Sequence, residues 1–211
     1  MNEGEKYILN LIGEGEHQQL DFKFAINDSA KIARTLSAFS NTEGGRLLIG
    51  VKDNGKIKGV QSEEEYYMIE SSALRYCLPV VSFEVKKWIV EGKTVLEVYI
   101  PPAATRPVLA RDAEDRWRAY IRVGDQNILA NHILLQVWKR KQRPGGTLVT
   151  YTEREDTLLS FLSTHPDSEM DTLQAALGVN RKILKNLLIN LISIGVISMD
   201  IGEKKTSFRI R

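Results

Sequence analysis

Apolar residues recur along the first two thirds of the chain at two spacings, helical and strand-like, and the two alternate. Ile32, Leu36 and Phe39 lie three to four residues apart, which predicts an amphipathic helix. The compact apolar run 46–51 predicts a strand, and the Asn-Gly pair that follows predicts a tight turn into a returning strand at 57–60. This alternation is typical of a mixed α/β domain.

The remaining elements of this first region follow the same logic. We expect a helix at 62–76, a hairpin of strands at 82–90 and 94–100, a strand at 117–123 and a closing helix at 130–142. Four basic residues and then Pro144-Gly145-Gly146 come after the last helix, and Pro and Gly are the strongest local breakers. The predicted organisation is therefore a domain at 1–143, a linker at 144–150 and a second domain at 151–211.

The second domain has a different pattern. Helical periodicity at 152–164, 171–177 and 181–194, with a tight connection through Gly178, predicts a helix-turn-helix. Two short apolar strands at 196–199 and 207–210 then enclose a polar loop, as in a wing. The predicted fold class is an α/β domain with a mixed sheet, followed by a small winged helix.

Composition narrows the class of protein. Of 211 residues, 43% are hydrophobic and 27% charged, which is average for a globular chain and argues against disorder. No apolar run is long enough for a membrane span, and the N-terminus lacks a signal-peptide pattern, so we expect a cytoplasmic protein. The single cysteine, Cys77, excludes an internal disulfide and a thiolate zinc site. A net charge of +2 is too small to identify a nucleic-acid partner by itself.

Three carboxylates and a lysine form a candidate catalytic set. Glu16 and Asp21 lie five residues apart, Lys23 follows, and Asp53 comes after the strand at 46–51. Hard cations such as Mg²⁺ or Mn²⁺ prefer oxygen ligands, so this set fits a metal-dependent nuclease. The alternative is a charged strand followed by a turn-forming Asp53, and the spacing leaves both open. No other cofactor is expected, and the lack of a Walker motif argues against an ATPase.

The glycine pair Gly44-Gly45 directly follows the first predicted helix. It fits a left-handed helix cap with a close chain reversal. It also fits a backbone contact to phosphate, since glycine amides can approach an anion without a side chain in the way.

Three blocks of the sequence resemble the Schlafen AlbA-like domain family, whose members have also been labelled divergent AAA-type ATP-binding proteins. The blocks are EHQQLDFK at 16–23, AFSNTEGGRLLIGVKDNGKIKGV at 38–60 and YIRVGDQNILA at 120–130. The resemblance implies a nucleic-acid-binding α/β domain, common in bacterial proteins that also carry a winged helix and are described as transcriptional regulators. In nuclease-active animal members the corresponding acidic pattern resembles Glu16, Asp21 and Asp53, with Asp21 in place of the usual Glu. Those members use two such domains, so by analogy we expect this chain to form a homodimer.

Basic side chains are the candidates for contact with nucleic acid, because Arg and Lys neutralise phosphates. The candidates are Arg106, Arg118, Arg122, Asn180, Arg181, Lys182, Lys185, Lys204 and Lys205. The favoured interpretation is a transcriptional regulator that binds duplex DNA rather than RNA. A metal-dependent endonuclease and a protein-binding adaptor remain as alternatives.

Overall fold

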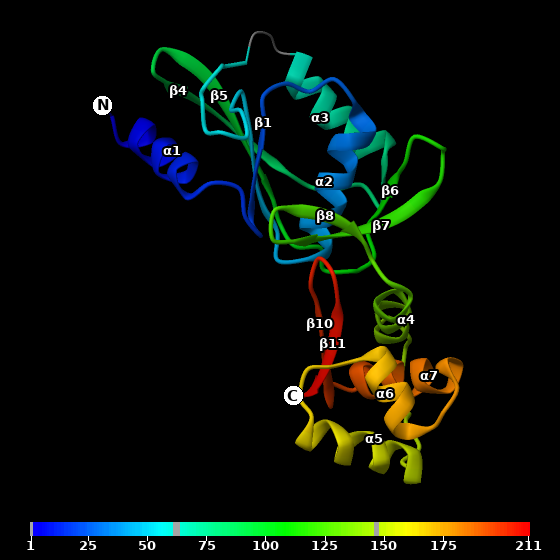
Figure 1. Ribbon diagram of the computed structural model, residues 1–211. Coiled ribbons are helices and arrows are strands. Elements are labelled where there is room, and N and C mark those ends of the chain that lie inside the picture. Colours follow the sequence, from blue (N-terminus) through cyan, green and yellow to red (C-terminus); the bar gives the residue numbers. More distant parts are fainter. Residues whose placement is uncertain (1, 61–63, 146–147) are drawn as a thin grey trace. The chain divides into compact units, whose positions relative to one another are not determined.

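The computed structural model describes residues 2–60, 64–145 and 148–211 (Figure 1). The chain divides into two compact units, Met1–Ala130 and Asn131–Arg211. The expected α/β class with mixed sheets is confirmed. None of the helices in the described part of the chain is long and apolar enough to cross a bilayer.

The first unit contains a mixed four-stranded sheet in the order β1-β2-β5-β4. Its strands are β1 (Leu20–Lys23), β2 (Gly45–Ile49), β5 (Lys93–Ile100) and β4 (Glu84–Val90). β1 runs parallel to β2, whereas β5 is antiparallel to both of its neighbours. Helix α1 (Glu3–Glu14), which periodicity did not reveal, buries Ile8 in a cluster with Leu20, Leu48 and Val95.

A second sheet in the same unit has the order β3-β6-β7-β8 and is antiparallel. Its strands are β3 (Cys77–Leu78), β6 (Leu109–Arg111), β7 (Trp117–Val123) and β8 (Gln126–Leu129). Helix α2 (Ser29–Asn41) packs against it, and helix α3 (Glu64–Arg75) packs on α2. The buried Asn41 amide donates to the carbonyls of Val108 and Tyr120, so α2 is also hydrogen-bonded to the strand region.

The expected returning strand at 57–60 is wrong. The Asn-Gly turn is present, because Gly55 N–H donates to the Lys52 carbonyl. The Lys58 and Gly59 N–H groups also donate to the Gly50 carbonyl, but the pairing of Val51 with Ile57 is an isolated bridge and does not extend into a strand. Both edges of β2 are already paired, with β1 on one side and β5 on the other, so no edge remains for this segment. Ser62 and Glu63, expected at the start of the next helix, lie outside the described residues.

In its described residues, the second unit contains four helices and a small antiparallel sheet in the order β10-β11-β9. Its elements are α4 (His132–Lys141), α5 (Glu153–Thr164), β9 (Ser168–Glu169), α6 (Met170–Leu177), α7 (Arg181–Ser193), β10 (Ile197–Ile201) and β11 (Thr206–Ile210). Leu158, Leu173, Leu184, Leu188 and Phe208 form the centre of its core. The predicted pair α6–α7 and the hairpin β10–β11 are therefore present as elements.

Helix α4 belongs to this second unit and does not close the first one. Ile133 and Val137 are buried in the same cluster as Leu184 and Leu188, and Arg140 hydrogen-bonds Asn190 of α7. The units divide between Ala130 and Asn131, which places the boundary before α4 instead of at 144–150. An apolar stripe predicts that a helix buries one face, but it does not specify which core receives that face.

Candidate nucleic-acid interface

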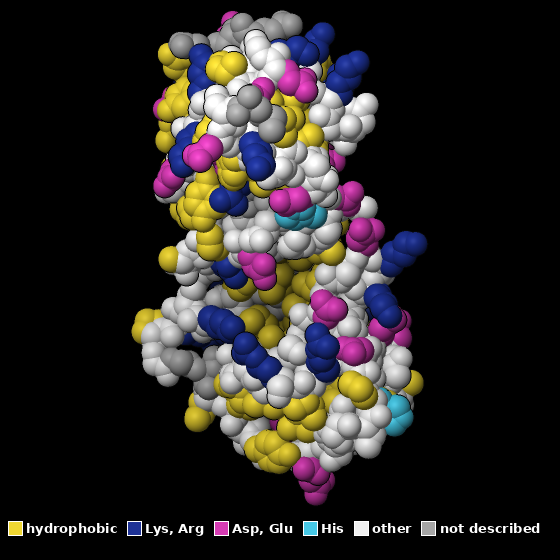
Figure 2. Space-filling model, turned by 90° about the vertical axis from the view of Figure 1, so that its left-hand side faces the viewer, with side chains coloured by type: hydrophobic (Ala, Val, Ile, Leu, Met, Phe, Trp, Pro, Cys, Tyr) yellow, Lys and Arg dark blue, Asp and Glu magenta, His cyan; other side chains and the backbone are white. Residues whose placement is uncertain are grey.

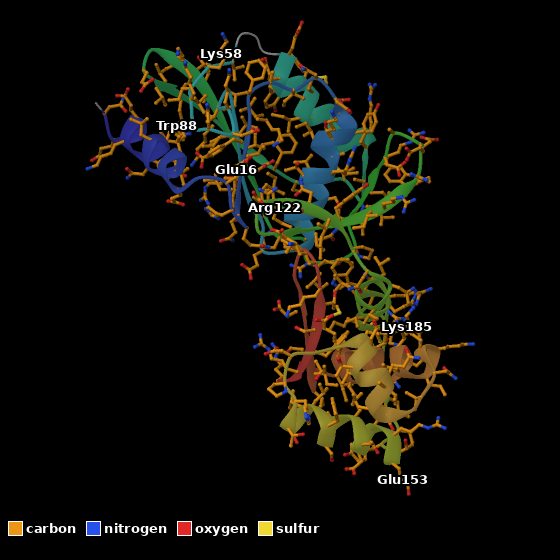
Figure 3. All side chains as sticks on the ribbon, viewed as in Figure 1. Glu16, Lys58, Trp88, Arg122, Glu153 and Lys185 are labelled. Atoms are coloured by element: carbon orange, nitrogen blue, oxygen red, sulfur yellow. The ribbon has the colours of Figure 1, made fainter. Side chains whose placement is uncertain are left out.

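Helix α7 separates an apolar side from a basic side. Leu184, Leu187, Leu188 and Leu191 are buried, at the three-to-four-residue spacing of one helical face. Arg181 and Lys182 are exposed in its first turn, and Lys185 is partly exposed one turn further on. Figure 3 labels Lys185 on α7. The buried stripe fixes the orientation of the helix. Ile189, one turn after Lys185 on the same side, is also buried, so the solvent-facing cations are confined to the first two turns of α7.

Further cations lie in the hairpin of the same unit. Lys204 and Lys205 are exposed between β10 and β11, and Arg209 is exposed on β11. The Nε atom of Arg209 lies 3.7 Å from Asp167 Oδ1, and Arg181 pairs with Asp171 at 2.5 Å. These pairs are solvent-exposed and therefore weak. Figure 2 shows Lys and Arg side chains on one face of the second unit, interspersed with Asp and Glu side chains.

Asn180 has a structural task that accounts for its position. Its side chain accepts a hydrogen bond of 2.9 Å from the backbone N–H of Ile183, which makes it the N-cap of α7. A capping side chain satisfies an amide that has no partner within the helix. Its amide oxygen is therefore engaged by the helix itself.

Arg122 was expected to contact phosphate, and the structure contradicts this. The residue is 2% exposed, and its Nη2 donates to the Leu20 carbonyl at 3.1 Å and to Asp21 Oδ1 at 3.2 Å. Its Nη1 donates to Asn127 Oδ1 at 3.1 Å, and the guanidinium lies over the Phe39 ring. A guanidinium enclosed in this way ties β7 to β1 and is not available to a ligand (Figure 3).

Glu16, Asp21 and Lys23 are brought together, as the first sequence block implied. Lys23 Nζ lies 2.9 Å from Asp21 Oδ2 and 3.9 Å from Glu16 Oε1. The Phe22 N–H donates to Glu16 Oε1 at 2.9 Å. Burial raises the pKa of Glu16, and the neighbouring Asp21 raises it further, while the Phe22 amide and Lys23 act in the opposite direction.

Asp53 does not join this cluster. It lies on the exposed turn beyond β2, whereas Asp21 pairs in register with Leu47 inside the sheet. Among residues 2–60, 64–145 and 148–211, no group of three or more His, Cys, Asp or Glu side chains could hold a metal ion. The buried Asp21 carboxylate already faces two cations, so the residues present do not fit the expected three-carboxylate site.

The glycine pair caps α2 and starts β2. Gly44 has a φ of 75°, its N–H donates to the Phe39 carbonyl at 2.9 Å, and an added Cβ would come within 2.6 Å of the Ile100 carbonyl oxygen. A Cβ on Gly45 would lie 2.4 Å from the Phe39 ring. These distances support the interpretation as a helix cap with a close chain reversal, because neither position has room for a side chain. The Gly44 amide expected to contact phosphate already donates to the Phe39 carbonyl.

The two other arginine candidates of the first unit remain partly accessible. Arg106 donates to the Thr42 carbonyl, and burial lowers the pKa of its guanidinium. Arg118 Nε donates to Asp112 Oδ2 at 3.0 Å. Beside Arg118 lies Arg34 of α2, which sequence reasoning missed because an arginine within a helix carries no motif.

Taken together, the geometry defines a two-unit α/β protein with a basic helical surface. The model of the family described as Schlafen, AlbA_2 matches residues 16–131, more than half of the chain, so the chain belongs to this family. The match ends at the boundary between the two units.

Two solved structures are similar to this chain. The DIP2311 protein from Corynebacterium diphtheriae is 21% identical with a TM-score of 0.48, covering 96% of this chain and 37% of its own. The N-terminal domain of a putative ATP-dependent DNA helicase RecG-related protein from Nitrosomonas europaea is 24% identical with a TM-score of 0.41, covering 63% of this chain and 97% of its own. This chain therefore spans well under half of the DIP2311 protein. No curated protein matches.

Proposed function

We propose that this protein binds duplex DNA through the second unit, acting as a winged helix, and works as a transcriptional regulator. The observation that carries the proposal is the set of solvent-facing cations in the first two turns of α7, away from its buried leucine stripe. The order α5-β9-α6-α7-β10-β11 supports it, because a helix-turn-helix followed by a hairpin presents its second helix to DNA. Membership of the Schlafen AlbA_2 family adds nucleic-acid binding as an expectation for the first unit.

Duplex DNA is favoured over RNA for a geometric reason. An α-helix with its side chains is about 10–12 Å wide and enters the major groove of B-DNA, which is about 12 Å wide. The deep and narrow major groove of an RNA duplex does not admit side chains. In this proposal the first turns of α7 enter the groove, Lys182 and Lys185 neutralise phosphates at its edge, and Lys204 and Lys205 contact the backbone from the hairpin.

The test measures binding of fluorescent duplex DNA by anisotropy over a range of salt concentrations. We expect affinity to fall steeply with salt. The slope of log K against log salt is negative. The double variant Lys182→Ala/Lys185→Ala should make it shallower by about 2, since each phosphate that is no longer neutralised reduces the steepness by roughly 0.9. The matched control is Lys139→Ala, an exposed lysine on α4 of the same unit.

A denaturing gel of the same samples in Mn²⁺ separates the alternatives. Full-length DNA strands would support a regulator, whereas shortened strands that disappear when EDTA is added would favour an endonuclease. Equal slopes for the double variant and the Lys139→Ala control would refute the role of α7. If the protein binds no duplex DNA at low salt, the proposal is refuted and the protein-binding adaptor remains as the interpretation.

A further inference from the structure

A second polar feature of the first unit is a cavity of about 280 Å³, separate from Glu16 and Asp21. It lies where β7, β8, the turn between β6 and β7, and helix α2 contribute side chains. Its lining residues are Arg34, Asp112, Ala113, Glu114, Arg116, Arg118, Tyr120 and Leu129. We refer to it below as the Arg34 cavity.

The charges in the Arg34 cavity do not balance. Arg116 and Arg118 both contact the largely buried Asp112 Oδ2 at 3.0 Å, and Arg116 also pairs with Glu114. Arg34 adds a third positive charge, so three cations and two carboxylates line the cavity. Between them, the lining side chains therefore carry an excess positive charge when the acids are ionised.

Asp112 keeps its charge throughout the neutral range. Burial acts to raise the pKa of this carboxyl, but hydrogen bonds from the backbone and side chain of Arg116 and from Arg118 lower it to about 2. An ionised Asp112 holds both guanidinium groups in place. Arg118 uses only its Nε in this contact, so its terminal nitrogens have no assigned partner within the described part of the chain.

Among the described residues that line the cavity, Arg34 is the cation without an acidic partner. Its Nε is buried and has no hydrogen-bond partner in the ranges that the structure describes. Its guanidinium lies 6.0 Å from the centre of the Tyr120 ring, which supports the group from one side. A buried donor that remains unpaired costs free energy, and a bound acceptor would remove that cost.

We propose that the Arg34 cavity binds a phosphate group. Arginine presents its donors in a planar fork that matches phosphate oxygens, and Arg34 and Arg118 supply two such forks at one cavity. The cavity volume of about 280 Å³ leaves room for a phosphate group beside the two arginines. A phosphate accepts more hydrogen bonds than a carboxylate, so it uses both forks at once.

The inference stands apart from the proposed role of α7, because it concerns another unit and is tested with phosphate alone. Two sources share this chemistry, namely a nucleic-acid backbone and a free phosphate ester. The experiment titrates the full chain with inorganic phosphate and follows the ³¹P line width, and in parallel measures duplex DNA binding. The variant is Arg34→Gln, and the matched control is Arg75→Gln, an exposed helical arginine of α3.

We expect saturable broadening at millimolar phosphate in the wild type and in Arg75→Gln, and a loss of affinity of about tenfold in Arg34→Gln, as expected for one charge-assisted hydrogen bond. Arg34→Lys keeps the charge without the fork and is expected to be intermediate, with circular dichroism confirming the fold. Weaker duplex binding by Arg34→Gln would show that the bound phosphate belongs to the nucleic-acid backbone. Unchanged duplex binding would show that it belongs to a free phosphate ester. Equal broadening for Arg34→Gln and Arg75→Gln would overturn the inference. Because phosphate is measured separately, a chain that binds no DNA still tests the cavity.

Discussion

Arg122 shows how one buried side chain connects distant parts of the first unit. Its guanidinium on β7 reaches the Leu20 carbonyl and the Asp21 carboxylate of β1, and its Nε donates to the His17 carbonyl at 3.3 Å. Gln18 adds reciprocal bonds, donating to the Arg122 carbonyl at 2.7 Å and accepting from Gly124 N–H at 2.9 Å. The two sequence blocks at 16–23 and 120–130 are therefore in direct contact.

The Arg122→Ala variant is expected to lower the free energy of unfolding by about 3–5 kcal/mol, because it leaves the Asp21 carboxylate buried without this partner. Urea unfolding followed by circular dichroism measures this, with Arg75→Ala as the exposed control. Wild-type stability combined with weaker nucleic-acid binding would contradict the structural role and restore the phosphate contact first expected at this residue.

The residue scale also shows where sequence reasoning reached its limit. Asp21 and Lys23 are close because they occupy alternate positions on β1, and Glu16, which precedes this strand, is held beside them by the Phe22 N–H. The burial of Arg122 did not follow, because a charged residue in a strand is usually solvated and only its partners across β1 and β8 compensate its charge. Asp53 was grouped with the other acids by the motif, but it lies on the exposed turn beyond β2, whereas Asp21 is paired within the sheet.

At the scale of elements, the N-cap role of Asn180 in α7 can be tested separately from any contact with DNA. Replacing it with Ala removes the hydrogen bond to Ile183 N–H and is expected to cost about 1 kcal/mol. Asn180→Asp keeps a capping oxygen and should retain stability, which thermal unfolding measures. If Asn180→Asp destabilises the protein as much as Asn180→Ala does, the capping role is wrong.

Element prediction succeeded where the pattern was local. Periodicity located α2, α5 and α7, and the hairpin β4–β5 followed from alternation around a Gly-containing turn. It failed at 57–60, where strand-like residues find no free sheet edge. Short strands such as β6 were missed because three residues carry no measurable period.

At the scale of the whole molecule, the division before α4 makes a prediction about fragments. A fragment of residues 131–211 should fold cooperatively, whereas 144–211 lacks Ile133 and Val137 and should lose about 3–6 kcal/mol of unfolding free energy, at about 1.5–3 kcal/mol for each buried side chain. Urea unfolding of the two fragments provides the comparison. Equal stability would mean that α4 contributes nothing to this core, contrary to its burial.

The expected homodimer belongs to the same scale and remains a proposal. A winged helix that acts as a regulator binds two half-sites when its chain is a symmetric dimer, with spacing near one turn of DNA, about 34–36 Å. Dimerisation therefore determines whether the target is a palindrome.

By itself, the sequence determined helices α2 to α7, the hairpins β4–β5 and β10–β11, the α/β class and the cations in the first turns of α7, because each depends on spacing within one short segment. Only the tertiary structure decided that Arg122 is buried, that Asp53 stands apart, that Arg34 faces a cavity and that α4 joins the second core. These outcomes depend on packing between residues far apart in the chain. Such packing is selected by which surfaces bury each other and which polar groups find partners, and local periodicity does not encode that choice.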